Sequence, residues 1–384
     1  MFDLKNLYII RKKFHRIPEL AFQEIKTQDL ILSEFADKSM MKSTLPLSKE
    51  ANTAPLLLTK FEPTGLLYEY ANGDGDYILF RADMDALPIK EETGCDFQSE
   101  HSGVSHACGH DIHLTILIGL IHYVIKYKLK KNILFLFQPA EEGHGGAEHI
   151  IKTGVFEKYK IKAAFALHIT GQYPTGSIGI KSGIFFGIPQ EFDIEFFGKS
   201  GHVATPQKGN DAFMAGMLYY QMIKNMLSNR FPAQEPIIFH IGKISSGSVR
   251  NSIPDYCKFE GTFRCLKKEV RDSILNMLQK SSEMLENFTE IKIKVTTLSS
   301  YDPVVNDDFL TKFLIESLPE DINVHYADYT MTGEDFGFFS GLFPSVLFWL
   351  GTNSNDDLHS NKFLPDEKSI EIALRIYKNI LEKI

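Results

Sequence analysis

The sequence is poor in cysteine and contains neither a long block of one charge nor a long apolar run. Its four cysteines, Cys95, Cys108, Cys257 and Cys265, form no C-x-x-C pair, and nothing else in the sequence points to secretion. We therefore expect free thiols in a reducing, cytoplasmic compartment. No block of Lys or Arg stands out and the formal net charge is −8, which argues against a binder of nucleic acid or of anionic membranes.

A membrane-spanning helix is not expected either. The longest apolar run, residues 114–125, is interrupted by His122 and is shorter than the roughly 20 apolar residues that span a bilayer. Residues 1–5 lead directly into a mixed-charge helical pattern, without a cleavable apolar stretch. The run at 114–125 is typical of a buried helix.

The 384 residues suffice for two domains, and the apolar pattern changes along the chain accordingly. In the outer parts of the sequence, short apolar runs alternate with helical patterns, which predicts an α/β fold with a mostly parallel sheet flanked by helices. The expected helices cover residues 6–35, with a break near Pro18, and begin near Asp111 and Asp366; the expected strands are residues 77–80, 133–137, 163–167 and 346–350.

The middle of the chain has a different pattern. Residues 191–196 alternate between acidic and apolar side chains, as in a half-exposed strand. Helices are expected at residues 211–227 and 268–288, and strands at 237–244, 258–263 and 291–297. This β-α-β-β-α-β order is typical of an α+β sandwich with four antiparallel strands. We therefore predict a small domain, residues 184–298, inserted into a larger one, residues 1–183 and 299–384.

The strongest chemical signal is the segment from His106 to His113, which reads His-Ala-Cys-Gly-His-Asp-Ile-His directly before an apolar helix. Cys108 and His110 can both face one point if the segment is extended, and a thiolate with an imidazole makes a suitable edge for a metal site. Glycine at position 109 lets the backbone turn tightly. The alternative is a helix N-cap at Asp111 with incidental histidines.

Three further segments place metal-binding or acid–base side chains after predicted strands. Glu141 and Glu142 follow a buried strand, where one carboxylate can bind a metal while its neighbour acts as general base. A solvated loop is the alternative for this pair. His168 ends one predicted strand and His359 lies in a loop after another, and either one alone is more often structural. The four segments together favour a metal site.

Six segments resemble the M20 metallopeptidase/amidohydrolase family, in its aminoacylase-like branch. They are residues 14–20, 81–88, 106–113, 138–143, 198–202 and 331–336, in the expected order along nearly the whole chain. The resemblance implies a catalytic dinuclear-metal domain, an inserted lid and dimerisation domain, and a homodimer. The implied reaction is metal-dependent hydrolysis of the amide bond of a small N-acyl amino acid.

By this resemblance, five residues hold two divalent ions (Mn, Zn, Co or Ni), and Glu141 is the general base. The five implied ligands are Cys108, His110, Glu142, His168 and His359. The wider family has His-x-Asp where this chain has Asp83-Met84-Asp85. We favour Asp85 as the residue that orients a ligand or the base, and Asp83 is the alternative.

Substrate contacts are expected in the inserted domain. His202 is a candidate to complete an oxyanion site, which the resemblance places across the dimer interface. Asn251 and Arg264 are candidates to bind the substrate carboxylate. For Arg264, a solvated charge at a strand edge is the alternative. Residues 204–207, Ala-Thr-Pro-Gln, depart from the usual family pattern, so contacts there are expected to differ.

Segments 173–179, 241–244, 331–337 and 348–351 carry a closer likeness to members that deacetylate N-acetyl-LL-diaminopimelate in bacterial lysine biosynthesis. A hydrolase of hippurate or other N-acyl amino acids and a metallo-dipeptidase are alternatives with the same metal motifs. A cysteine hydrolase that uses Cys108 and a binding protein without catalysis are alternatives of other classes. Glu334 and Asp335 are expected to line the site or to cap the following helix.

Overall fold

The computed structural model describes residues 2–36 and 56–384, and these form two compact units. Unit 1 comprises the described residues of Met1–Phe185, Val304–Tyr329 and Asp335–Ile384. Unit 2 comprises Phe186–Pro303 and Thr330–Glu334. That unit 2 acts as a lid and dimerisation domain stays a prediction.

Unit 1 is built on an eight-stranded mixed sheet with the order β1-β2-β4-β3-β5-β16-β6-β15. Its strands are β1 Leu56–Lys60, β2 Leu66–Ala71, β3 Tyr77–Asp83, β4 Asn132–Gln138, β5 Ile161–Thr170, β6 Ser177–Ile180, β15 Asn323–Tyr326 and β16 Ser345–Gly351. The four strands predicted from the sequence are β3, β4, β5 and β16. They are the central strands of the sheet, and every pairing between two of them is parallel. The predicted α/β fold is thereby confirmed.

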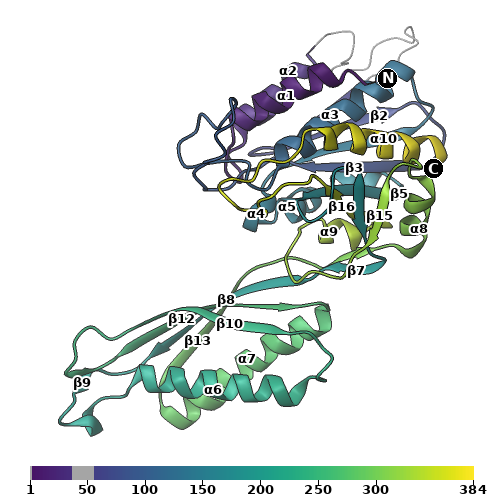
Figure 1. Cartoon of the computed structure of the whole chain (residues 1–384). Helices are drawn as coiled ribbons and strands as arrows, with labels where there is room; N and C mark the ends of the chain where they lie inside the picture. Colours follow the sequence, from purple (N-terminus) through teal and green to yellow (C-terminus); the bar gives the residue numbers. More distant parts are fainter. Residues whose placement is uncertain (1, 37–55) are drawn as a thin grey trace. The chain divides into compact units, whose positions relative to one another are not determined.

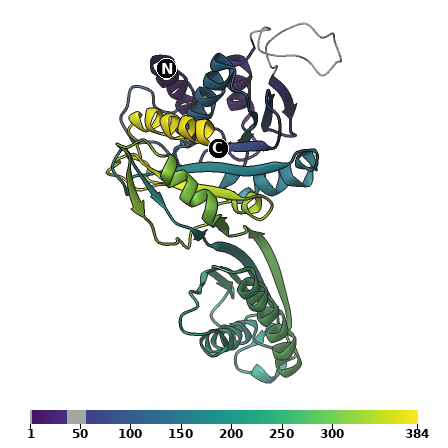
Figure 2. The ribbon, with the colours of Figure 1, turned by 90° about the vertical axis from the view of Figure 1, so that its right-hand side faces the viewer.

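Helices cover both faces of this sheet. In Figure 1, α1, α3 and α10 lie on one side of β3, whereas α5 and α9 lie on the other. Figure 2, turned by 90°, again shows the yellow helix α10 beside the blue helix α3. The helices of unit 1 are α1 Leu4–Arg16, α2 Ile25–Glu34, α3 His110–Tyr127, α4 Glu141–His144, α5 Gly146–Lys152, α8 Asp308–Ser317, α9 Gly337–Ser340 and α10 Lys368–Lys383.

Helix α3 is the centre of the unit 1 core. Nearly every residue from His110 to Val124 is buried, because the helix packs against α1, α10 and the sheet at once. A helix that is apolar on all sides is expected in such a position. Within the described parts of the chain, no helix combines the length and the apolar character that crossing a membrane requires.

Unit 2 contains a four-stranded antiparallel sheet with the order β10-β12-β8-β13. Its elements are β8 Ile188–Phe197, β9 Gly201–His202, α6 Ala212–Arg230, β10 Ile238–Ser246, β11 Ser252–Ile253, β12 Tyr256–Cys265, α7 Lys268–Thr289 and β13 Lys292–Ser300. Alternate residues of β8 are buried beneath α6 and α7, which form one layer on the sheet (Figure 1). The predicted β-α-β-β-α-β order is confirmed.

Candidate metal centre

The predicted ligands of unit 1 meet at the carboxyl-terminal edge of the central parallel strands, where open α/β sheets place their ligands. Glu141 and Glu142 follow β4, and His359 lies in the loop after β16. His168 lies within β5, which continues to Thr170, so the prediction that it ends the strand is corrected. The longer strand is stabilised by its pairing with β16, which extends to Gly351.

Cys108 and His110 reach this edge through a turn. The segment is not extended, because His110 already begins α3 and Gly109 has a φ of 77°. This left-handed conformation favours glycine. A Cβ at position 109 would also lie 2.1 Å from Cδ1 of Ile169. The glycine therefore sets the thiol on one side of the turn and the imidazole at the start of the helix.

The five predicted ligands and Glu141 lie together in the structure. The Sγ atom of Cys108 is 3.3 Å from Nε2 of His168 and 3.5 Å from Nε2 of His359. Nε2 of His359 is 3.5 Å from Oε1 of Glu142. Ligand atoms of His110, Glu141 and Glu142 lie within 4.8 Å of one another, as do those of Cys108, His110 and His168.

Two of the histidines present the same nitrogen to this centre. Nδ1 of His110 is 2.9 Å from the backbone oxygen of Asp85, and Nδ1 of His168 is 2.8 Å from that of Ile169. Because a carbonyl oxygen only accepts hydrogen bonds, Nδ1 carries the proton in each ring and Nε2 is left for another partner. Histidines that bind metals usually have this second hydrogen bond.

The donor set fits a divalent metal ion. Among residues 2–36 and 56–384, Nε2 of His110 is buried without a hydrogen-bond partner. Burial lowers the pKa of His168 to about 3, so its imidazole is neutral at pH 7. Burial, with the carboxylates of Glu142 and Glu141, raises the pKa of the Cys108 thiol. A cation that binds thiolate, imidazole and carboxylate would satisfy all of these groups.

Asp85 and Asp83 have different partners. The Oδ1 and Oδ2 atoms of Asp85 accept hydrogen bonds from the backbone N–H groups of Glu141 (3.1 Å) and Glu142 (2.9 Å). Asp83 instead accepts from Nη1 of Arg81 at 2.7 Å and from Nδ1 of His113 at 2.6 Å. Asp85 thus positions the pair of glutamates directly, whereas Asp83 orients a histidine whose other nitrogen accepts from Ile169 N–H.

Two further carboxylates support the centre. Asp335 is buried and accepts hydrogen bonds from Nη2 of Arg81, Nε2 of Gln138 and the N–H of Ala147. Asp335 therefore links β3, β4 and α5. This role differs from the two that the sequence suggested, which were lining the site and capping the following helix.

Glu24, which the sequence did not single out, accepts from the N–H of Ala140 at 2.9 Å. Ala140 has a φ of 56°, so Glu24 holds a strained turn directly before Glu141. Burial, and then the charge of Asp85, raise the pKa of Glu24 to about 7.

The three predicted substrate-binding residues all lie in unit 2, but not at one place. His202 pairs with Ser252 between β9 and β11, and the N–H of Val203 donates to the backbone oxygen of Asn251. Arg264 lies opposite Pro189 near the other end of β12. Strand β12 begins at Tyr256, shortly after β11 in the sequence. The eight residue-to-residue steps from Tyr256 to Arg264 correspond to roughly 26 Å of extended strand. The structure therefore groups His202 with Asn251 and separates Arg264 from both.

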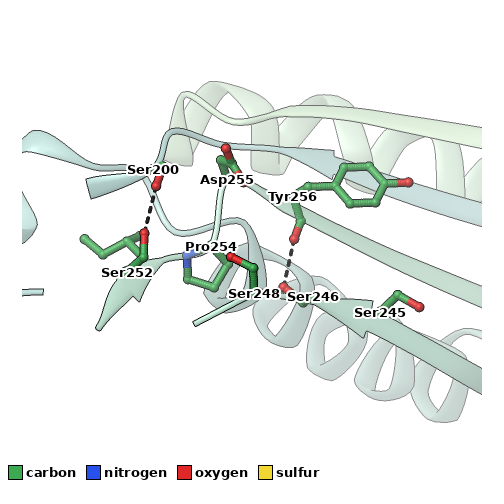
Figure 3. A pocket seen from close by; sticks show the side chains of 10 residues that line it. Ser200, Ser245, Ser246, Ser248, Ser252, Pro254, Asp255 and Tyr256 are labelled. Atoms are coloured by element: carbon green, nitrogen blue, oxygen red, sulfur yellow. Dashed lines mark hydrogen bonds between the residues drawn. The ribbon is translucent and has the colours of Figure 1, made fainter. Parts of the chain in front are cut away.

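A pocket of about 310 Å³ adjoins the His202 strand pair. Its walls carry several serine hydroxyls, and Oγ of Ser200 is 2.8 Å from Oγ of Ser252 (Figure 3). The hydroxyl of Ser246 donates to the backbone oxygen of Tyr256 at 2.8 Å. Hydroxyl groups can donate to a carboxylate or accept from an ammonium, so the pocket suits a small polar group.

Comparison with known proteins agrees with this geometry. The family model described as peptidase family M20/M25/M40 matches residues 79–383. The N-acetyldiaminopimelate deacetylases of Bacillus pumilus (strain SAFR-032) and Bacillus subtilis (strain 168) are 34% and 36% identical to the chain; the first alignment covers 100% of this chain and 99% of the relative, the second 97% of each. A solved dinuclear metal binding peptidase of the M20 family from Bacillus subtilis matches with a TM-score of 0.80 and 26% identity, over 99% of both chains. The chain belongs to peptidase family M20/M25/M40 and is a metallohydrolase of the amidohydrolase type.

Proposed function

We propose that this enzyme hydrolyses N-acetyl-LL-diaminopimelate to acetate and LL-diaminopimelate, a step of lysine biosynthesis. The observation that supports it most is the convergence of Cys108, His110, Glu142, His168 and His359 around Glu141. The names of the relatives at about 35% identity support the choice of substrate.

The five ligands would hold two divalent ions, and the protein would supply the base. When bound, such ions activate water and polarise the amide carbonyl. The side chain of Glu141 is buried at the same edge, and Asp85 fixes its backbone. Its carboxylate takes the proton of the attacking water and later returns it to the leaving nitrogen of the amide.

The chain is proposed to act as a homodimer that associates through unit 2. Helix α6 exposes Phe213, Met214, Met217 and Leu218, and the edge strand β10 exposes Ile238 and Ile244. An apolar surface beside an unpaired strand edge is typical of an interaction site. In the dimer, His202 and Asn251 would contact substrate bound by the partner copy, and the neighbouring serine pocket would receive a polar group of that substrate.

The substrate and the metal dependence are tested together. Protein stripped of metal and reloaded with Mn²⁺, Zn²⁺, Co²⁺ or Ni²⁺ is assayed for amine release from N-acetyl-LL-diaminopimelate, hippurate and a set of dipeptides. We expect metal-dependent release that is fastest from N-acetyl-LL-diaminopimelate. Faster release from hippurate or from a dipeptide would contradict the proposed substrate, and equal rates in the stripped protein would contradict the metal mechanism.

A further inference from the structure

A second group of metal-binding side chains lies in unit 1, formed by residues outside the proposed dinuclear centre. His15 is near the end of α1, and Glu91 and Cys95 lie in the segment between β3 and α3. One ligand atom from each of these three residues lies within 4.8 Å of the other two. Oε1 of Glu91 is the common point, 3.1 Å from Nε2 of His15 and 3.7 Å from Sγ of Cys95.

The ring of His15 has the orientation of a metal ligand. Its Nδ1 atom is 2.9 Å from Oδ2 of Asp111, and the same oxygen accepts from Nε of Arg11 at 3.1 Å. The side chains of His15 and Asp111 are only 2% and 1% exposed. A carboxylate that accepts from one ring nitrogen fixes the tautomer and leaves the other nitrogen for a metal. The other nitrogen, Nε2, faces Glu91 at 3.1 Å, and a bound metal ion would take the place of its proton.

The carboxylate of Glu91 is held from both sides. Its Oε2 atom accepts from the N–H of Ser99 at 2.7 Å, and the hydroxyl of Thr93 donates to Oε1. The side chain is 6% exposed, whereas Cys95 is half-buried, so the group can exchange ions with solvent on the Cys95 side. The ligand atoms are therefore positioned by hydrogen bonds that do not depend on an ion.

The charges of this group suit a divalent cation. The carboxylate of Glu91 lies beside the thiol of Cys95 and the imidazole of His15. A divalent ion would be attracted by the carboxylate of Glu91 and by the thiolate of Cys95. With such an ion, the positive charges of the metal and Arg11 balance the negative charges of Cys95, Glu91 and Asp111. Thiolate, imidazole and carboxylate are also the ligands that Zn²⁺ takes in proteins.

We propose that His15, Glu91 and Cys95 form a separate binding site for one divalent cation, with Zn²⁺ as the preferred ion. The site completes its fourth position with water, as three-ligand zinc sites do. Its occupancy is independent of the proposed deacetylase activity, because none of its three residues belongs to the ligands or the base of that reaction.

The site is tested by zinc content in the full-length protein. Wild-type and Cys95→Ser proteins are loaded with Zn²⁺, passed through a desalting column and measured by elemental analysis. We expect the Cys95→Ser protein to hold one equivalent less than wild type and to keep its turnover, whereas Cys265→Ser, a control in unit 2, loses none. Equal zinc content in wild-type and Cys95→Ser proteins would overturn the proposal.

A second measurement separates this site from the dinuclear centre. In a Cys108→Ala background, Co²⁺ is expected to give a thiolate-to-cobalt absorption band that disappears when Cys95→Ser is added. Zn²⁺ is also expected to slow alkylation of Cys95, followed by peptide mass spectrometry. A band that survives Cys95→Ser, or rapid alkylation of Cys95 that Zn²⁺ does not change, would contradict a metal site; the latter result would indicate a reactive thiol.

Discussion

The carboxylate of Asp85 accepts a hydrogen bond from the backbone N–H of Glu142 over 2.9 Å. Its other oxygen accepts from the N–H of Glu141, and its backbone oxygen lies 2.9 Å from Nδ1 of His110. One residue thus positions the proposed base and two proposed ligands. This arrangement favours Asp85 over Asp83 for the positioning role that the sequence left open.

Replacing Asp85 with Asn should weaken the centre without unfolding the protein. The amide has one oxygen for two N–H donors, and its own N–H₂ group would face a donor. We expect a loss of about 10- to 100-fold in metal affinity or in kcat/KM, which is typical when a partner of a metal ligand is changed. Metal titration and kinetics at saturating metal measure both. Asp96→Asn is the control, because the Asp96 side chain is 82% exposed; wild-type values for Asp85→Asn would refute the positioning role.

Cys108→Ala should reduce the metal content of the purified protein. The thiol lies among His168, His359 and Glu142. Elemental analysis after dialysis measures the loss. Cys257→Ala is the matched control, since Cys257 is a buried cysteine of unit 2. Full metal occupancy in the Cys108→Ala protein would exclude Cys108 as a ligand.

Arg81→Met should lower the free energy of unfolding by about 3–5 kcal/mol, because it leaves buried carboxylates without their partner. Arg81 donates to Asp83 and Asp335, and all three side chains are 0% exposed. Denaturant unfolding of the metal-free protein measures the change. Arg375→Met removes an exposed ion pair with Asp321 and should change stability little. Equal effects of the two substitutions would show that the buried network is not needed for stability.

Glu24→Gln should remove a pH dependence of stability. The pKa of Glu24 is raised from 4.5 to about 7 in the folded chain, so folding favours the protonated form. Its contribution is present below pH 4.5 and is lost as the pH rises through about 7; at 1.36 kcal/mol per pKa unit this amounts to roughly 3 kcal/mol. Gln keeps an acceptor for the N–H of Ala140 and stays neutral. Unfolding of metal-free protein at pH 5 and pH 8 should therefore show a smaller decrease for Glu24→Gln than for wild type. Glu148→Gln is the control and should behave like wild type, because the Glu148 side chain is 46% exposed.

The sequence predicts the centre of the unit 1 sheet better than its edges. Continuous apolar runs such as residues 133–137 identify strands that are buried on both faces. The outer strands β1, β2, β6 and β15 were not predicted. β1 and β15 have mixed exposure. β6 is a four-residue strand with a central glycine. Their pairing with distant neighbours decides their conformation, and local periodicity does not contain that information.

The residues of the candidate site were likewise only partly predictable from the sequence. Local spacing singles out Cys108, His110 and the glutamate pair, whereas the full ligand set depended on the family resemblance. Glu24 was missed because its partner, Ala140, lies 116 residues away. The left-handed conformation of Ala140 is equally invisible in the sequence, since alanine rarely adopts it.

The most direct test of the proposed mechanism is turnover of N-acetyl-LL-diaminopimelate by metal-replete Glu141→Gln protein, with metal content measured on the same sample. Gln preserves the size of the side chain and the backbone hydrogen bond to Asp85 but cannot accept the proton of water. We predict wild-type metal content and a decrease in kcat of about 10²- to 10⁴-fold. Wild-type turnover by a metal-replete Glu141→Gln protein would contradict the assignment of Glu141 as the base.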